Sequence, residues 1–117
     1  MTVESLWTYR AGVFEDESLS VIGFDVETTD GVIGTVDEES NVDGDSFVVA
    51  DVGFLSFGKR VLLPAAAVTR IDPHARSVHL SLSKEEIEGA PEFDENTYRS
   101  PAYRARLDDH YGRLPVA

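Results

Sequence analysis

The segment 39–45 has the residue types that bind calcium in proteins. Oxygen-bearing side chains stand at alternate positions of its sequence, ESNVDGD, and Gly44 is the sixth residue, as in a calcium-binding loop. The twelfth position counted from Glu39 is Ala50, however, where such a loop needs a bidentate glutamate. The chemistry of a polar turn explains Asp43-Gly44 without a metal. We therefore expect weak surface cation binding at most, and no metal site.

The other groups that could do chemistry form no recognisable constellation. The histidines, His74, His79 and His110, lack the spacing of metal ligands. With 22 Asp and Glu residues, no pair stands out as an acid and a base, whose pKa values must be split by their environments. Neither a Gly-x-Ser-x-Gly elbow nor a glycine-rich phosphate loop occurs, and there is no cysteine. We expect no enzyme activity, no catalytic residue and no cofactor.

The charge is distributed unevenly along the 117 residues. The net charge is −12, and residues 1–58 contain 13 acidic side chains but only one basic side chain, Arg10. Residues 59–117 contain nine of each sign. Because nucleic-acid binding depends on Lys and Arg that neutralise phosphates, we expect no nucleic-acid partner. The acidic half serves solubility alone or faces a basic partner, and the composition is also compatible with a high-salt organism.

No segment of the sequence has the features of a signal peptide or a membrane helix. The first ten residues have no basic flank followed by an apolar run, and no apolar run approaches the roughly 20 residues of a membrane span. We expect a cytoplasmic protein without direct membrane insertion.

Residues 21–82 have the two-residue period of β-strands. Ile22, Phe24 and Val26 alternate with polar or small residues, as in a strand with one buried face. Asp30-Gly31 predicts the type I′ turn of a hairpin, and Gly34 leaves room for a close approach or a bend. The pattern predicts strands at 22–26, 32–36, 47–52, 60–63, 68–71 and 78–82, with a polar turn at 41–45.

The pattern becomes helical after Leu82. Ser83 and Glu86 have the spacing of a capping box, and Gly89 ends the short helix that they begin. Ser100-Pro101 predicts the start of a second helix. The apolar stripe of that helix consists of Tyr103, Leu107 and Tyr111. Such a stripe docks on the barrel or on a second chain.

An ordered set of short motifs resembles the PRC-barrel family. The set comprises GFDV at 23–26, DGVIGTV at 30–36, FVV at 47–49, GKRVLLP at 58–64, VHL at 78–80, SKEEI at 83–87 and APEF at 90–93. The resemblance covers about residues 20–95 and fits a small stand-alone bacterial or archaeal member. It implies a mainly β fold, a small PRC-type β-barrel of five to six strands with a short capping helix and a C-terminal helical tail. It also implies use in protein contacts, with no enzyme activity common to the family.

These expectations divide the chain into an N-terminal arm (1–20), a PRC-barrel-like domain (21–95) and a C-terminal helical tail (96–117). The apolar loop 53–58 and the aromatic residues of the two ends are the candidate partner-binding sites. They are Phe54, Leu55, Phe57, Trp7, Tyr103 and Tyr111. The same side chains could instead be covered within the chain, where the aromatic ones would close the ends of the barrel.

We predict a non-catalytic protein-binding adaptor that self-associates as a homodimer, since an open barrel edge invites pairing with a second copy. Its protein partner is not identified by the sequence. The alternative is a small-ligand or cation-binding module that uses the mouth of the barrel.

Overall fold

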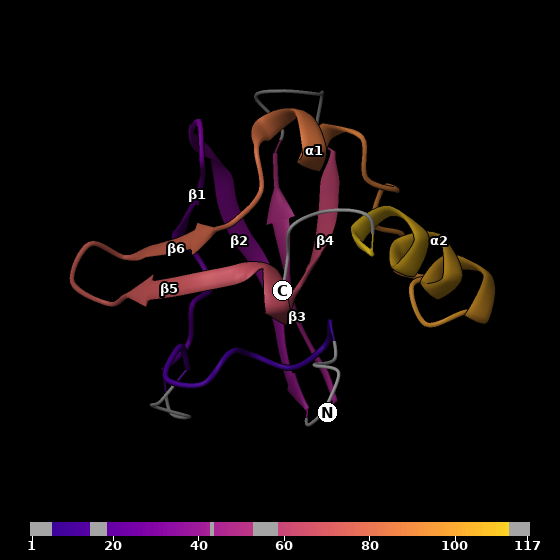
Figure 1. The fold of residues 1–117 in the computed structure, drawn as a ribbon, viewed down its shortest axis with the longest axis horizontal. Helices are drawn as coiled ribbons and strands as arrows, with labels where there is room; N and C mark the ends of the chain where they lie inside the picture. The colour runs from indigo at the N-terminus through magenta and orange to yellow at the C-terminus, as the bar shows by residue number, and fades with distance from the viewer. Residues whose placement is uncertain (1–5, 15–18, 43, 53–58, 113–117) are drawn as a thin grey trace.

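Six strands form a single sheet in the computed structural model, which describes residues 6–14, 19–42, 44–52 and 59–112. The strands are β1 (Asp25–Thr28), β2 (Gly31–Val42), β3 (Asp45–Asp51), β4 (Arg60–Pro64), β5 (Val68–Asp72) and β6 (Ser77–Leu80). Their order in the sheet is β4-β3-β2-β1-β6-β5, and β1 and β6 pair in parallel. The predicted mainly β, barrel-like fold is confirmed, although the ladder ends at β4 and β5 and does not close (Figure 1).

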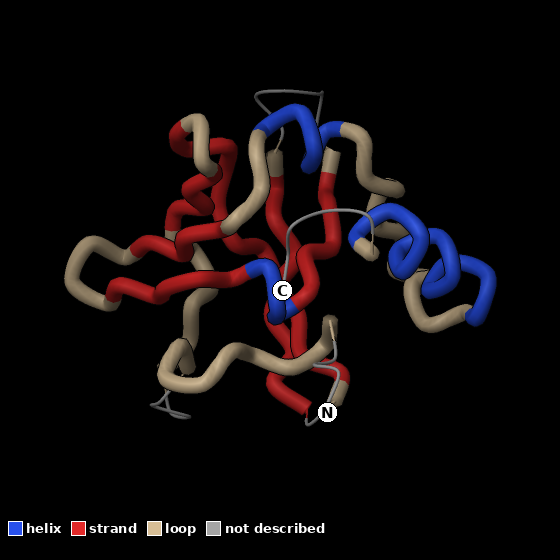
Figure 2. The backbone as a smooth tube through the Cα atoms, viewed as in Figure 1, coloured by secondary structure: helices blue, strands red, loops and turns tan. Residues whose placement is uncertain are grey.

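Two α-helices and one short 3₁₀ helix complete the described fold (Figure 2). The 3₁₀ helix η1 (Ala65–Ala67) joins β4 to β5. Helix α1 (Lys84–Glu88) has the predicted capping box, because the backbone N–H of Glu86 donates to Ser83 Oγ and that of Ser83 donates to Glu86 Oε1. Helix α2 (Pro101–Tyr111) begins at the predicted cap, Ser100. No helix of the described residues is long and apolar enough to cross a membrane.

The first strand begins later than predicted. Gly23 has a φ of 86°, which takes the chain out of extended geometry, and β1 starts only at Asp25. Phe24 and Val26 are buried as expected, but Ile22 is 51% exposed. The prediction that Ile22 belongs to the buried face was wrong because the glycine interrupts the alternation.

The β1–β2 hairpin lies where it was predicted, but its turn is shifted by one residue. Thr28 pairs with Gly31, so Thr29 and Asp30 form the turn and Gly31 follows it with a φ of 117°. The hydroxyl of Thr28 donates to Gly31 O at 2.8 Å and accepts from the N–H of Asp30 at 3.0 Å. Asp30 does not have positive φ, so the predicted type I′ turn, which needs it at both central positions, was wrong.

Strand β2 is longer than the predicted 32–36 and contains a bulge. Val36 pairs with Ala50 and Glu38 pairs with Val49, so Asp37 is the additional residue. A bulge interrupts the alternation of faces, and Asp37 and Glu38 are consequently both exposed. The strand continues to Val42 because its ladder with β3 continues, beyond the last apolar residue of the alternating pattern.

Gly34 lies where β2 passes close to the backbone at the end of β3. A Cβ atom at this position would overlap the backbone carbonyl of Asp51 on β3, and it would also crowd the Cα of Val52. Backbone atoms cannot yield as a flexible side chain would. The prediction that this glycine permits a close approach is therefore confirmed.

We predict that Gly34→Ala lowers the free energy of unfolding by about 1–3 kcal/mol, the usual cost of overpacking a core. Urea unfolding followed by tryptophan fluorescence measures it. The control is Gly89→Ala, because Gly89 has a helical φ of −78° and a Cβ there meets only ordinary van der Waals contacts. That variant should be neutral or more stable by about 0.4–1 kcal/mol. Equal stabilities of the two variants would contradict the close approach.

Candidate functional site

A row of four aromatic rings connects the N-terminal arm, the β2–β3 hairpin and the segment before α2. Trp7 packs against Phe47 with ring centroids 6.3 Å apart, and Phe47 packs against Tyr98 at 6.2 Å. Tyr98 in turn contacts Phe93 at 5.2 Å. Residues that are up to 91 positions apart in the sequence, from 7 to 98, thus share one surface.

Each end of this aromatic row, and its middle, is covered by an arginine. The guanidinium carbon lies within the roughly 6 Å at which a cation is attracted to a ring face. The distances to the ring centroids are 5.1 Å for Arg60 and Phe93, 4.9 Å for Arg99 and Tyr98, 4.6 Å for Arg104 and Trp7, and 5.6 Å for Arg104 and Phe47. The rings of this surface are therefore already used as platforms for cations.

Three carboxylates bind Arg60, and a single carboxylate binds the other two arginines. Arg60 Nη1 is 3.2 Å from Asp37, 3.3 Å from Glu38 and 3.1 Å from Glu95, so three carboxylates share one nitrogen. The bulge of β2 makes this possible because it exposes Asp37 and Glu38 in succession. Hydrogen bonds to Glu95, then to Asp37, raise the pKa of Arg60 further above its ordinary value.

Asp45, the first residue of β3, binds the other two arginines with its two oxygens. Oδ2 is 3.0 Å from Arg99 Nη1, and Oδ1 is 2.9 Å from Arg104 Nη1. Arg104 also donates from Nε to the carbonyl of Tyr98 at 3.0 Å, and its side chain is only 20% exposed. Charge-assisted hydrogen bonds of this kind are stronger than neutral ones, so this carboxylate fastens α2 to the hairpin.

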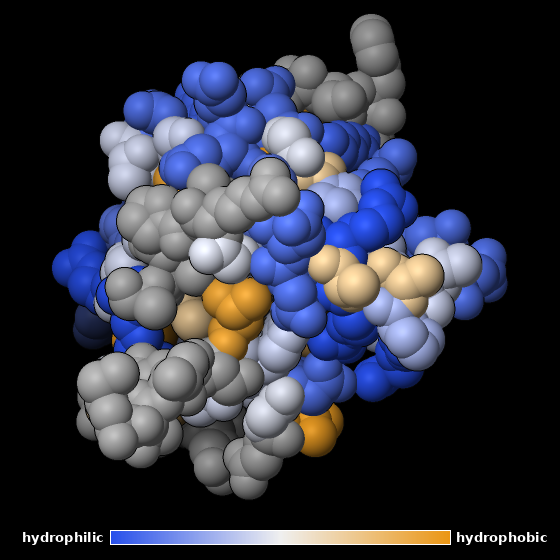
Figure 3. All heavy atoms as spheres, turned by 45° about the vertical axis from the view of Figure 1, so that its right-hand side comes forward, coloured by the Kyte–Doolittle hydropathy of each residue, from blue (hydrophilic) through white to orange (hydrophobic). Residues whose placement is uncertain are grey.

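A cavity of about 150 Å³ lies between the hairpin and the segment 93–99. Its lining consists of Glu38, Glu39, Ser40, Phe47, Phe93, Tyr98 and Arg99. We call it the hairpin–tail cavity. The molecular face on which α2 lies is otherwise mostly hydrophilic, with small and separate hydrophobic areas (Figure 3).

The sequence pattern does not distinguish Glu38, Glu39 or Tyr98 as parts of one surface. The bulge that brings these residues together cannot be recognised in the hydrophobic pattern. Asp37, Glu38 and Glu39 are all acidic, so a shift of the register by one residue leaves the pattern unchanged. The excess of carboxylates in the first half was the one signal that pointed toward this surface.

The predicted partner-binding residues occupy different environments. Phe54, Leu55 and Phe57 lie outside the described residues. Trp7 is half-buried in the aromatic row. The rings of Tyr103 and Tyr111, by contrast, belong to the core of the chain itself.

Tyr103 is 4% exposed and Tyr111 is fully buried. Their hydroxyls donate within the chain, from Tyr103 to the carbonyl of Pro91 at 3.3 Å and from Tyr111 to that of Leu62 at 2.8 Å. Both side chains are therefore covered within the chain, which is the alternative that the sequence left open. Their rings pack α2 on the sheet, and a partner would reach them only if the helix came away.

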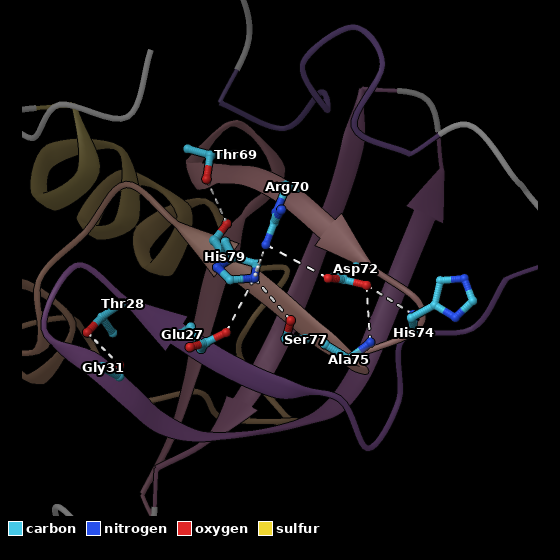
Figure 4. A network of polar contacts seen from close by, with 10 residues as sticks. All are labelled: Glu27, Thr28, Gly31, Thr69, Arg70, Asp72, His74, Ala75, Ser77 and His79. Carbon is cyan, nitrogen blue, oxygen red and sulfur yellow. Dashed lines mark hydrogen bonds and ion pairs between the residues drawn. The ribbon is translucent and has the colours of Figure 1, made fainter.

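A second polar cluster joins β1, β5 and β6 around His79 (Figure 4). His79 Nε2 lies 3.3 Å from Glu27 Oε2, 3.0 Å from Ser77 Oγ and 3.1 Å from Arg70 Nη2. Serine, histidine and a carboxylate suggest a hydrolase triad, in which serine and carboxylate contact opposite nitrogens of the ring. Here both contact the same nitrogen, so the ring cannot relay a proton between them in this arrangement.

Asp72, beside this cluster, and His110, on α2, have structural roles. Asp72 Oδ1 accepts the backbone N–H groups of His74 and Ala75 and thereby shapes the β5–β6 turn. These hydrogen bonds, that of Ala75 first, lower the pKa of Asp72. His110 contacts the carbonyl of Glu86 at 2.8 Å. Within the described residues, no three His, Asp or Glu side chains are placed to hold a metal ion.

The comparisons with known proteins show similarity to solved structures alone. No family model matches the chain, and no curated protein matches it. A putative 16S ribosomal RNA processing protein, RimM of Pseudomonas aeruginosa, matches with a TM-score of 0.47 and 19% sequence identity. The match covers 61% of this chain and 48% of that protein, about half of its length. Similarity at this level has no bearing on function.

We predict that Arg104→Ala lowers the free energy of unfolding by roughly 2 kcal/mol, because it removes a shielded ion pair, a hydrogen bond and two ring contacts. Urea unfolding measures the loss. Arg106→Ala is the matched control, since Arg106 lies exposed on the same helix, and surface substitutions usually change stability by less than about 0.5 kcal/mol. Equal effects of the two substitutions would show that Arg104 does not fasten the helix.

We also predict that alkali unfolds the protein through its buried tyrosines. Burial raises the pKa of Tyr103 to about 12 and raises that of Tyr111 as well, whereas an unfolded tyrosine ionises near pH 10. Because the folded pKa values are the higher ones, the stabilisation is complete below about pH 10 and is lost as the pH rises toward about 12.

Urea unfolding between about pH 9 and pH 12 tests this prediction on the wild type and Tyr111→Phe. The variant should lose about 1 kcal/mol at neutral pH with its hydrogen bond. Above pH 10 the stability of the variant should fall less steeply than that of the wild type. The two slopes should differ by up to about 1.4 kcal/mol per pH unit. Parallel pH profiles would contradict the assignment of the alkaline loss to Tyr111.

Proposed function

We propose that this domain is a non-catalytic protein-binding module, and that the hairpin–tail cavity is part of its contact surface. The observation that carries the proposal is the meeting of aromatic rings and charged groups around a cavity. Aromatic residues and arginine are the residue types that dominate the energetics of protein interfaces. Phe47, Tyr98 and Arg99 provide both types within one small surface.

The size of the cavity favours a side chain of a protein over a metabolite. Sites for small molecules usually enclose roughly 300–1,000 Å³, whereas this cavity measures about 150 Å³. A volume of about 150 Å³ accommodates one ring-sized group. A single side chain that projects from a partner fits this space, and the partner's backbone would lie across its rim.

We propose that the domain is not catalytic because of the geometry of its polar clusters. Ser77 is buried and shares one nitrogen of His79 with Glu27. The carboxylates of Asp37, Glu38 and Glu95 bind Arg60, which ties them to a structural cation.

A protein is favoured over a nucleic acid as the partner because of charge. The matched RimM protein is named for ribosomal RNA processing, but the net charge of −12 on this chain repels a phosphate backbone. The order of the sequence motifs supports membership of the PRC-barrel family. A cytoplasmic location also remains an expectation from the sequence.

We further propose that the domain self-associates. Strand β5 is an edge of the sheet, and edge strands pair readily with other chains. The other edge strand, β4, is covered by the segment that contains Glu92 and Phe93. The backbone N–H of Phe93 donates to the carbonyl of Arg60, and Val61 forms a β-bridge with Glu92. In β5, an irregularity at Thr69 and the exposed Arg70 are features that oppose edge pairing. A homodimer would therefore use another surface more readily than a continuous sheet.

Selection from a random peptide display library tests the proposed function. We expect enriched peptides to shift the backbone amide NMR signals of Ser40, Phe47 and Tyr98 in the ¹⁵N-labelled protein. Ser40→Trp, which fills the cavity, should weaken binding by about tenfold or more, as expected for a central contact. Ala75→Trp in the exposed β5–β6 turn should leave binding unchanged, and thermal melting checks that both variants fold.

Two results would overturn the proposal. One is a selection that enriches no peptide, and the other is peptide binding whose shifts lie only around His79 and β5. A labelled RNA oligonucleotide serves as the comparison ligand. If RNA bound the protein and no peptide did, the domain would be a nucleic-acid-binding module instead.

A further inference from the structure

We propose that the hairpin–tail cavity binds the guanidinium group of an arginine in a basic segment of the protein partner. This inference rests on the proposed function and adds the chemistry of the ligand. Three features of the described residues support it. They are the arginine-bound aromatic rings, the excess of carboxylates over guanidinium groups, and the ion pair that already occupies the one arginine of the lining.

The rings around the cavity already bind guanidinium groups. Phe93 and Tyr98 each carry an arginine at 5.1 and 4.9 Å, and Phe47 has one at 5.6 Å. All three rings line the cavity. An arginine stacks on aromatic faces and presents a planar fork of donors to carboxylates, so a fourth guanidinium would find the same combination of ring and carboxylate.

Carboxylates outnumber guanidinium groups at this surface. Five carboxylates lie at or beside the cavity, and three guanidinium groups pair with them. The carboxylates are Asp37, Glu38, Glu39, Asp45 and Glu95, and the arginines are Arg60, Arg99 and Arg104. Like charges this close repel one another, so a further cation would lower the electrostatic energy of the site.

Glu39 is the carboxylate whose charge is least compensated. Its Oε2 accepts a hydrogen bond from the backbone N–H of Val21 at 3.1 Å, and among the described residues it forms no ion pair. Its negative charge, after the larger effect of burial, raises the pKa of the neighbouring Tyr9. Glu39 is therefore the residue expected to bind the incoming guanidinium group.

Arg99, the one arginine in the lining, does not block such a ligand. Its charge is already paired with Asp45 at 3.0 Å, its Nε donates to the hydroxyl of Tyr98 at 2.8 Å, and its side chain is 60% exposed. An acidic ligand would have to compete with Asp45 for it and would also meet Glu38 and Glu39. The negative charge around the cavity thus favours a basic segment over an acidic one and increases its rate of association with the domain.

An NMR titration with two short peptides tests this inference. The probe is acetyl-Gly-Ser-Arg-Ser-Gly-amide, and its comparison peptide has citrulline, a neutral isostere, in place of arginine. We expect the arginine peptide to shift the amides of Ser40, Phe47 and Tyr98 saturably. The citrulline peptide should bind about fivefold more weakly or worse, the scale of a desolvated cation–ring contact.

Two variants that remove the same charge locate the effect. Glu39→Gln keeps the acceptor for Val21 and should weaken binding of the arginine peptide roughly two- to fivefold. Glu88→Gln, at an exposed position on α1, should leave it unchanged. Equal weakening by both variants would show attraction by net charge only and would overturn the inference.

The remaining outcomes separate this inference from the proposed function. Equal binding of both peptides at the cavity would overturn the role of the guanidinium and leave peptide binding in place. No saturable shift with the arginine peptide would also overturn the inference, while the library selection decides the proposed function independently. If calcium chloride at equal ionic strength gave the same shifts as the arginine peptide, the cavity would be a site for simple cations.

Discussion

One shielded ion pair, that between Asp45 and Arg104, connects three parts of the fold. Asp45 begins the third strand, and Arg104 lies in the first turns of the last helix, so their contact at 2.9 Å connects distant parts of the sequence. The same guanidinium group covers the ring of Trp7. The backbone carbonyl of Trp7 accepts the backbone N–H of Ser46, the residue next to Asp45. One cation therefore holds the arm, the hairpin and the helical tail together. A pair that is mostly withdrawn from water interacts more strongly than one on the surface.

This arrangement gives the uneven charge of the sequence an explanation besides solubility, a basic partner and a high-salt organism. Asp37, Glu38 and Asp45 belong to the acidic half of the chain, and the arginines that bind them belong to the second half. Charges that are separated along the sequence thus meet in the fold. Beside the aromatic row, Glu39 forms no such ion pair among the described residues and adds to a local excess of carboxylates.

Local rules predicted most of the elements, because each of them depends on neighbouring residues. The capping box at Ser83, the start of α2 at Ser100 and the close approach at Gly34 all belong to this group. The turn after Thr28 did not follow its rule because the threonine hydroxyl satisfies the turn and shifts it by one residue. The candidate site was less predictable. Tyr103 and Tyr111 could equally have faced a partner, and only the packing of α2 on the sheet decided that they are buried.

The same residues fasten the tail and line the cavity, and this links binding to stability. Phe47 lies under Arg104 and also forms part of the cavity wall, while Tyr98 holds Arg104 through its carbonyl and Arg99 through its hydroxyl. A ligand that binds only the assembled surface must stabilise the attachment of α2, since linkage between two such equilibria is reciprocal. The reverse also holds, because Arg104 of the helix contacts Phe47 and Tyr98, which line the cavity. The C-terminal segment thus belongs to the proposed binding surface and also covers the core. A partner that used this cavity would contact the tail and the sheet together.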